Sequence, residues 1–152
     1  LVTKMPESPL HYYVVTTLAE RLRAVAPAGT LVREAGPLTL EGSEPEPDLS
    51  VVSGSRGDYL EYHPEAALFI VEVALNSLRV DRRKALVFSR TNVPEYWIID
   101  LETRRVECYR NPSPDGYRSI HIHDSETELA FPIGARPAFR LGEVLPQQEL
   151  CS

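Results

Sequence analysis

Two acids and a lysine are the residues of this chain best suited to catalysis. Asp48 follows a proline-rich segment, Glu72 interrupts an apolar run, and Lys84 lies among arginines twelve residues after Glu72. Two carboxylates can hold a hard divalent cation that activates a water molecule, and a lysine can steady that water or a phosphate group. These three residue types are the minimal set for metal-dependent hydrolysis of a phosphodiester bond.

Glu72 gives the strongest single signal, because an acid is rare inside a buried strand. Residues 67–73 are apolar without alternation, which predicts a strand that is covered on both faces. An unsatisfied carboxylate is strongly unfavourable there, so Glu72 is paired, metal-bound or directed past the sheet. The alternative to a metal is a buried ion pair with one of the arginines.

Asp48 and Lys84 each have an ordinary structural explanation as well. By its position alone, Asp48 could be a turn or capping residue at the start of a strand. Lys84 could be a solvated lysine on an exposed helix face, although a short loop and a helix could also fold it back toward Glu72.

Other acids and histidines lie where they could assist. Glu20 and Asp81 are candidates for a supporting role, although Glu20 could equally face water and Asp81 could serve only the start of a helix. His11 either faces the site or packs beside it. His121 and His123 alternate on one strand face, but no third ligand has recognisable spacing, so a histidine metal site is not expected.

The charges are unevenly distributed along the chain, whose net charge is −6. Residues 41–72 hold eight acids and one base, whereas residues 79–90 hold five bases and one acid. An acidic segment beside a basic one suits a metal and a phosphate, and a surface network of salt bridges would look the same. Arg79, Arg82 and Arg83 are the candidate contacts to nucleic acid, although an acidic protein is an unusual partner for DNA.

Length and composition indicate one compact domain over residues 1–152. The chain is 43% hydrophobic, which is enough for a core, and no apolar run approaches the ~20 residues of a membrane span. No signal peptide is visible, and Cys108 and Cys151 do not imply an oxidising compartment, so the cytoplasm is expected. Because the first residue is Leu1, we expect the natural chain to begin earlier.

The pattern of apolar residues predicts an α+β fold. A helix capped by Ser8 is expected over residues 9–26, a second helix over 79–91, and a closing helical turn over 140–145. The expected core positions of the second helix are Val80, Leu86 and Val87. Extended segments are expected over residues 31–34, 38–40, 48–52, 67–73, 96–100, 104–109, 117–123 and 128–131. The segments 96–100 and 104–109 form a hairpin, so the C-terminal half is rich in hairpins.

Three stretches carry a resemblance to a known family. They are PEPDLSVV at residues 45–52, FIVEVALNSLRVDRRK at 69–84 and VPEYWIIDLETRRVECYR at 93–110. In these stretches the chain resembles the Uma2 family, also called DUF820, a group of endonuclease-like proteins. The resemblance extends from the helix around His11 to the closing LGEVLP.

This family is placed in the PD-(D/E)xK nuclease superfamily, which implies a restriction-endonuclease-like mixed sheet flanked by helices. Asp48 matches the first acid of the motif and Glu72 the second. The position two residues after Glu72, where the superfamily has lysine, holds Ala74, and Lys84 is the matching lysine of this family. The resemblance implies Mg²⁺ or Mn²⁺ bound by both acids and the Val73 carbonyl.

The resemblance also implies a metal-dependent endonuclease that hydrolyses DNA, with Glu20 as an outer-shell aid. Two alternatives remain open: a catalytically inactive nuclease-fold module that binds nucleic acid or protein, and a hydrolase of another phosphate ester. A homodimer is expected, because nucleases of this superfamily often pair to cut both strands. The strand edge that forms the dimer contact would come from the hairpin with Trp97 and Tyr109 or from the strand with His121.

Overall fold

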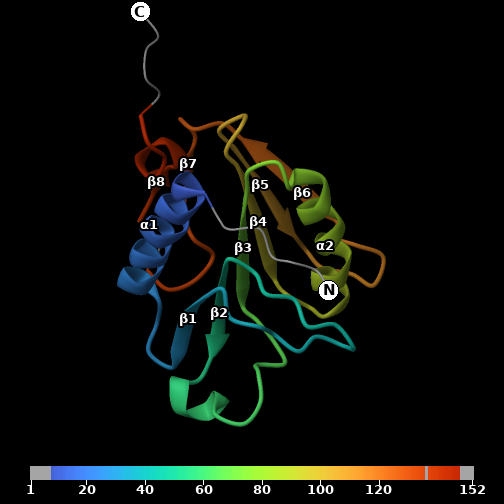
Figure 1. Cartoon of the computed structure of the whole chain (residues 1–152). Coiled ribbons are helices and arrows are strands. Elements are labelled where there is room, and N and C mark those ends of the chain that lie inside the picture. Colours follow the sequence, from blue (N-terminus) through green and yellow to red (C-terminus); the bar gives the residue numbers. More distant parts are fainter. Residues whose placement is uncertain (1–7, 136, 148–152) are drawn as a thin grey trace, which may run out of the picture.

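A six-stranded mixed sheet forms the centre of the computed structural model, which describes residues 8–135 and 137–147 (Figure 1). Its spatial order follows the sequence: β1 (Thr30–Glu34), β2 (Leu49–Ser53), β3 (Phe69–Ala74), β4 (Glu95–Asp100), β5 (Arg105–Arg110) and β6 (Ser119–His123). β3 and β4 are parallel and the other neighbouring strands are antiparallel. The α+β class, the mixed sheet and the β4–β5 hairpin are therefore confirmed.

Two helices, α1 (Pro9–Val25) and α2 (Leu78–Arg90), lie on opposite sides of this sheet (Figure 1). The Ser8 side chain accepts a hydrogen bond from the His11 amide at 3.1 Å, which confirms the expected cap of α1. α2 connects β3 to β4 and so lets these two strands run parallel.

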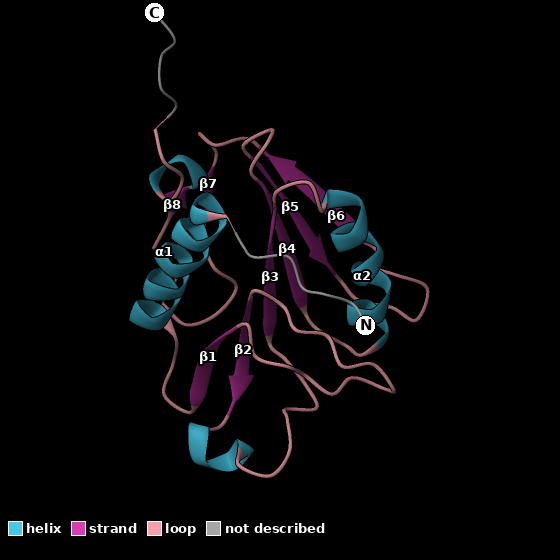
Figure 2. Cartoon of the chain, viewed as in Figure 1, coloured by secondary structure: helices cyan, strands magenta, loops and turns pink. Residues whose placement is uncertain are grey.

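Short elements complete the chain, as Figure 2 shows. They are the 3₁₀ helices η1 (Arg56–Tyr59) and η2 (Leu141–Glu143) and a small antiparallel sheet of β7 (Glu128–Leu129) and β8 (Phe139–Arg140). η2 lies within the closing helical turn that the sequence predicts. No helix in the described part of the chain is long and apolar enough to cross a membrane.

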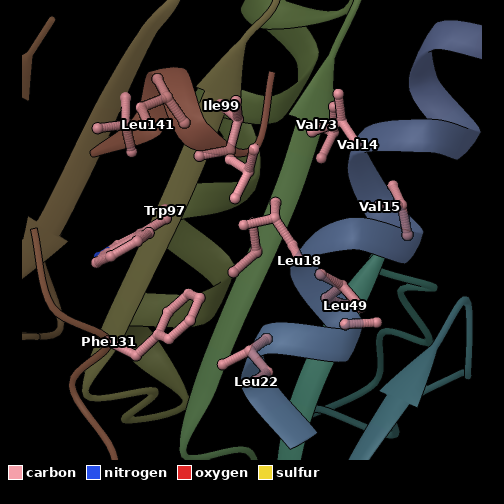
Figure 3. Close-up of a cluster of buried hydrophobic side chains, with 14 of the residues drawn as sticks. Val14, Val15, Leu18, Leu22, Leu49, Val73, Trp97, Ile99, Phe131 and Leu141 are labelled. Carbon is pink, nitrogen blue, oxygen red and sulfur yellow. The ribbon is translucent and has the colours of Figure 1, made fainter. Parts of the chain in front are cut away.

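The larger part of the core lies between α1 and one face of the sheet (Figure 3). Leu18 and Leu22 of α1 are fully buried there against Val73 and other strand residues. Trp97 contacts Phe69 edge to face, with the ring centroids 5.1 Å apart, and stacks on Phe131, with the ring centroids 5.6 Å apart. This packing holds α1, and with it His11, at a defined position over the sheet.

α2 packs on the other face with a rotation that differs from the prediction. Val80 is 51% and Leu86 38% exposed, whereas Ala85 and Phe88 are buried against the sheet. The polar residue Asp81 is also buried on this face, and the helix is turned to place it there. The predicted core positions Val80 and Leu86 were therefore wrong, because buried polar contacts at the start of α2 decide which face meets the sheet.

Two smaller expectations also need comment. Residues 38–40 form no strand, since only an isolated bridge joins Leu40 to Ser43, although Leu38 and Leu40 are buried. Cys108 is a free thiol whose pKa burial raises to about 12, so it is inert at neutral pH. Cys151 lies outside the described residues.

Candidate functional site

β2 and β3 separate at the end where Asp48 and Glu72 lie. Their last paired residues are Leu49 and Val71. Beyond this pair, side-chain carboxylates accept the hydrogen bonds that main-chain carbonyls accept within a sheet. The Val73 amide donates to Asp48 Oδ2 at 2.7 Å, and the Asp48 amide donates to Glu72 Oε1 at 2.6 Å. The two acids are thus fixed against each other's main chain at the point where the strands diverge.

Pro47 leaves a main-chain oxygen available at the same point. Continuing the register from Leu49 and Val71 by two residues places Pro47 opposite Val73. The Val73 amide faces β2, so its carbonyl faces the same way, and proline has no N–H to donate to it. The proline of the Pro-Asp pair therefore keeps a backbone oxygen beside Asp48 and Glu72.

Lys84 reaches this point from α2. Its Nζ lies 2.5 Å from Glu72 Oε2 and 3.2 Å from Asp81 Oδ1. The ion-pair partner of Glu72 is thus Lys84 and not an arginine, as the sequence alternative had it. Ala74, where the superfamily motif has lysine, is buried, and Lys84 supplies the ammonium group from the helix that covers this face.

Asp81 is the third carboxylate of the site and is 4% exposed. Its Oδ2 accepts a hydrogen bond from the Ser77 hydroxyl at 2.8 Å, and its backbone carbonyl accepts one from the Tyr96 hydroxyl at 2.8 Å. These contacts tie the first turn of α2 to β4 and set the position from which Lys84 extends. We call Asp48, Glu72 and Asp81 the carboxylate cluster.

His11 approaches the carboxylate cluster from α1. Its Nε2 lies 3.1 Å from Asp48 Oδ2, and both side chains are largely buried. Glu20, nine residues further on, is about two and a half helical turns away and therefore on the opposite side of α1, where it is exposed. Of the two residues considered on this helix, His11 contacts the cluster, and the Glu20 side chain has no hydrogen bond or ion pair to another described residue. The core-face spacing of His11, Val14, Leu18 and Leu22 is the signal that distinguishes them.

Burial and like charges control the protonation of Glu72. Burial, and after it the neighbouring Asp48, raise the pKa of Glu72 to about 7, although the Lys84 charge opposes the rise. Burial lowers the pKa of Lys84, but its two carboxylate partners outweigh this, so the pKa lies above the ordinary value and the lysine stays charged. Glu72 therefore binds a proton more tightly than an ordinary glutamate does.

The oxygen atoms at the fork, the point where β2 and β3 diverge, suit a hard divalent cation. Asp48 Oδ1 has no hydrogen-bond partner among the described residues, each Glu72 oxygen keeps a second lone pair, and the Val73 carbonyl faces the same gap. Within residues 8–135 and 137–147, no three His, Cys, Asp or Glu side chains are grouped as metal ligands. A metal here would therefore use the two carboxylates and the backbone carbonyl.

The three candidate arginines differ in their surroundings. Arg82 donates three hydrogen bonds, from Nε and Nη2, to the buried Glu107, which also accepts one from the Tyr109 hydroxyl at 2.8 Å. Arg79 and Arg83 lie one turn apart on the exposed side of α2 and have no ion pair among the described residues. Of the three candidate arginines, Arg79 and Arg83 are thus the two whose charge is not compensated by a described residue.

Comparison with known proteins identifies the family of this chain and its fold. A family model described as "Putative restriction endonuclease", Uma2, matches residues 1–141. The chain is also similar to a solved structure from Anabaena variabilis ATCC 29413, described as "a putative nuclease belonging to DUF820". The two share 17% sequence identity with a TM-score of 0.73, over 95% of this chain and 84% of that chain.

This structural similarity confirms a nuclease-like fold, and no curated protein sequence matches the chain. Family and fold together indicate a nuclease. The family match covers most of the chain, and the stretches that carry the resemblance include both acids and the lysine at the strand fork. The chain belongs to the Uma2 family.

Proposed function

We propose that the protein is a cytoplasmic, metal-dependent endonuclease that hydrolyses DNA phosphodiester bonds. The observation that carries this proposal is the convergence of Asp48, Glu72 and Lys84 at the fork between β2 and β3. The three residues come from three segments of the chain, and the Pro47 position leaves the Val73 carbonyl beside them. Membership of the Uma2 family supports the same reaction class.

Each residue has a defined part in this reaction. Asp48, Glu72 and the Val73 carbonyl would hold Mg²⁺ or Mn²⁺, and the bound ion supplies Lewis-acid activation of a water and of the phosphate. Lys84 places a positive charge beside Glu72, where it orients the attacking water or offsets negative charge on the phosphate. Asp81 acts through Lys84, which it holds from the other side.

The substrate part of the proposal rests on charge. Arg79 and Arg83 extend from the helix that also carries Lys84, and two unpaired guanidinium groups suit the phosphates on either side of the bond to be cut. We also infer a homodimer, because a duplex has two strands and each chain supplies one carboxylate cluster.

The test is a cleavage assay on plasmid, linear and single-stranded DNA with Mg²⁺ or Mn²⁺, in which Glu72→Ala runs beside the wild type. Calorimetric titration of both proteins with Mn²⁺ in the absence of DNA gives a second readout. We expect cleavage and Mn²⁺ binding by the wild type alone. Equal cleavage by both proteins would refute the site.

A second candidate is a nuclease-fold module that binds nucleic acid or protein without cutting. Two observations favour this module: Lys84 is already ion-paired with Glu72 and Asp81, and the net charge of the chain is −6. This candidate predicts salt-sensitive DNA binding with no cleavage in any metal and no Mn²⁺ binding.

A further inference from the structure

β6 (Ser119–His123) is the last strand of the six-stranded sheet, and its outer edge has no neighbouring strand in the described part of the chain. The ladder with β5 is extended by the Arg118 amide, which donates to the Asn111 carbonyl at 2.9 Å. Because backbone direction alternates along a strand, the even-numbered residues of β6 pair with β5 and the odd-numbered ones face outward. Three residues therefore present main-chain donors and acceptors to the outside: Ser119, His121 and His123.

The side chains of β6 do not protect this edge. Ile120 is 55% and Ile122 56% exposed, and the strand contains no charged residue and no proline. Exposed edges are normally guarded by charges, prolines or bulges that prevent pairing with another chain. The β6 edge has none of these features and carries two exposed isoleucines, so it is suited to pair with another strand.

We propose that a second copy of this chain covers the edge, by antiparallel pairing of β6 with β6 around a two-fold axis at His121. In this register Ile120 faces Ile122 of the second copy, and Ser119 faces His123. The strand ends are complementary too, because Arg118 faces Asp124 of the second copy at both ends. The sequence Arg-Ser-Ile-His-Ile-His-Asp is thus complementary to itself in charge and in apolar character.

Other registers lack this match. A shift that centres the axis on Ile120 places Arg118 opposite Ile122, and one centred on Ile122 places Ile120 opposite Asp124. A shift by a single residue would set outward-facing backbone groups against groups already paired with β5. The register at His121 alone satisfies the backbone, the isoleucines and the charges together.

The interface leaves the carboxylate cluster open, since β6 and the fork between β2 and β3 lie at different places across the sheet. It deepens the homodimer part of the proposed function by naming the contact surface. Dimerisation can be measured without DNA or metal, so a failure of this interface and a failure of the nuclease proposal give different results.

The first experiment is disulfide cross-linking in a Cys151→Ser background. His121→Cys places two thiols opposite each other on the axis, in a hydrogen-bonded pair whose Cα atoms are about 5.5 Å apart, which a disulfide can span. His123→Cys is the matched control on the same strand face, because its two copies lie about 13 Å apart in this register. We expect a covalent dimer from the first variant only. Equal cross-linking of both, or of neither, overturns the register.

The second experiment measures the mass of the full chain in solution by sedimentation. We expect twice 17.1 kDa for the wild type. Ile120→Glu should weaken dimerisation at least ~10-fold, and the double variant Ile120→Glu/Ile122→Lys should restore it, because the new charges face each other. Leu60→Lys, at a residue that is 83% exposed in another part of the chain, is the control and should stay dimeric.

A wild type that is monomeric at every concentration would overturn the proposal. So would a dimer that Ile120→Glu leaves intact, or a folded Ile120→Glu/Ile122→Lys variant that stays monomeric. Circular dichroism of each variant shows whether it is folded, and the double variant keeps the test decisive if the single substitution unfolds the chain.

Discussion

The ammonium nitrogen of Lys84 lies 2.5 Å from Oε2 of Glu72, although the two residues come from a helix and a strand. The same nitrogen lies 3.2 Å from Asp81. The Lys84 side chain is 37% exposed, whereas its two partners are buried. Lys84 therefore supplies the positive charge of the carboxylate cluster and separates the buried acids from solvent. This position makes Lys84 the first residue to test.

Lys84→Met should slow cleavage strongly and leave DNA binding unchanged. In the proposed reaction the substitution removes the charge that would lie beside the scissile phosphate, and loss of one such electrostatic contact lowers kcat by about 10²- to 10³-fold. Cleavage rates under saturating DNA, together with DNA binding in the presence of Ca²⁺, measure the two effects separately. Arg90→Met, at a cation near the end of the same helix whose side chain bonds to the Pro114 carbonyl, is the control and should keep full activity. A Lys84→Met protein that cleaves at the wild-type rate would contradict the assignment.

The protonation of Glu72 should appear in the stability of the metal-free protein. Its pKa is raised from 4.5 to about 7 by burial and by Asp48. Between these values the native state holds a proton that the unfolded state has released, so the free energy of unfolding falls as the pH rises from about 4.5 to 7. Below this window the contribution of Glu72 is fully present, and above it the contribution is lost.

Urea unfolding in EDTA, of the wild type beside Glu72→Gln, measures this contribution. The difference in unfolding free energy, wild type minus variant, should decrease with pH across that window, because glutamine does not titrate. Mn²⁺ affinity of the wild type should rise over the same window, since the metal requires the carboxylate. A difference that is constant from pH 4.5 to 7 would show that the pKa of Glu72 is not raised.

The parts of the candidate site that depend on neighbouring residues could be predicted from the sequence. The Ser8 cap, the buried run around Glu72 and the Pro-Asp pair at Asp48 are readable because each depends on neighbouring residues. The contact between Lys84 and Glu72 is not local, and it required the path of α2 across the sheet. The rotation of α2 was missed for the same reason, since Asp81 is held by contacts that hydrophobic periodicity does not report.

The choice between Glu20 and His11 could have been made from the sequence. The two residues are about two and a half helical turns apart, so only one can face the sheet, and His11 shares its face with the apolar positions of α1. The role of Pro47 could not have been found, because it depends on the register between β2 and β3.

His11→Ala should lower metal affinity and cleavage by roughly 10- to 100-fold, the usual effect of losing a group that orients a metal ligand. His11 lies 3.1 Å from the Asp48 oxygen that the Val73 amide also holds, so its removal loosens that carboxylate. Mn²⁺ calorimetry separates this effect from simple destabilisation, and His11→Gln should recover part of the affinity. Glu20→Ala, on the opposite side of the same helix, should change neither quantity. A Glu20→Ala protein with the larger loss would reverse the assignment of the two residues.

The exposed arginines of α2 should act on DNA binding and not on stability. Arg79→Gln and Arg83→Gln should each weaken DNA binding and lower the slope of log K against log salt concentration by about 1, because each removes one phosphate contact. Arg82→Gln should behave differently, since the Arg82 guanidinium is already bound by the buried Glu107, whose carboxylate would lose its partner. We therefore expect Arg82→Gln to lower the melting temperature and to change the salt slope little. DNA titrations at several salt concentrations, beside thermal unfolding of the same three proteins, measure both effects. If all three variants lose the same salt slope, Arg82 contacts DNA as well, and its pairing with Glu107 must open on binding.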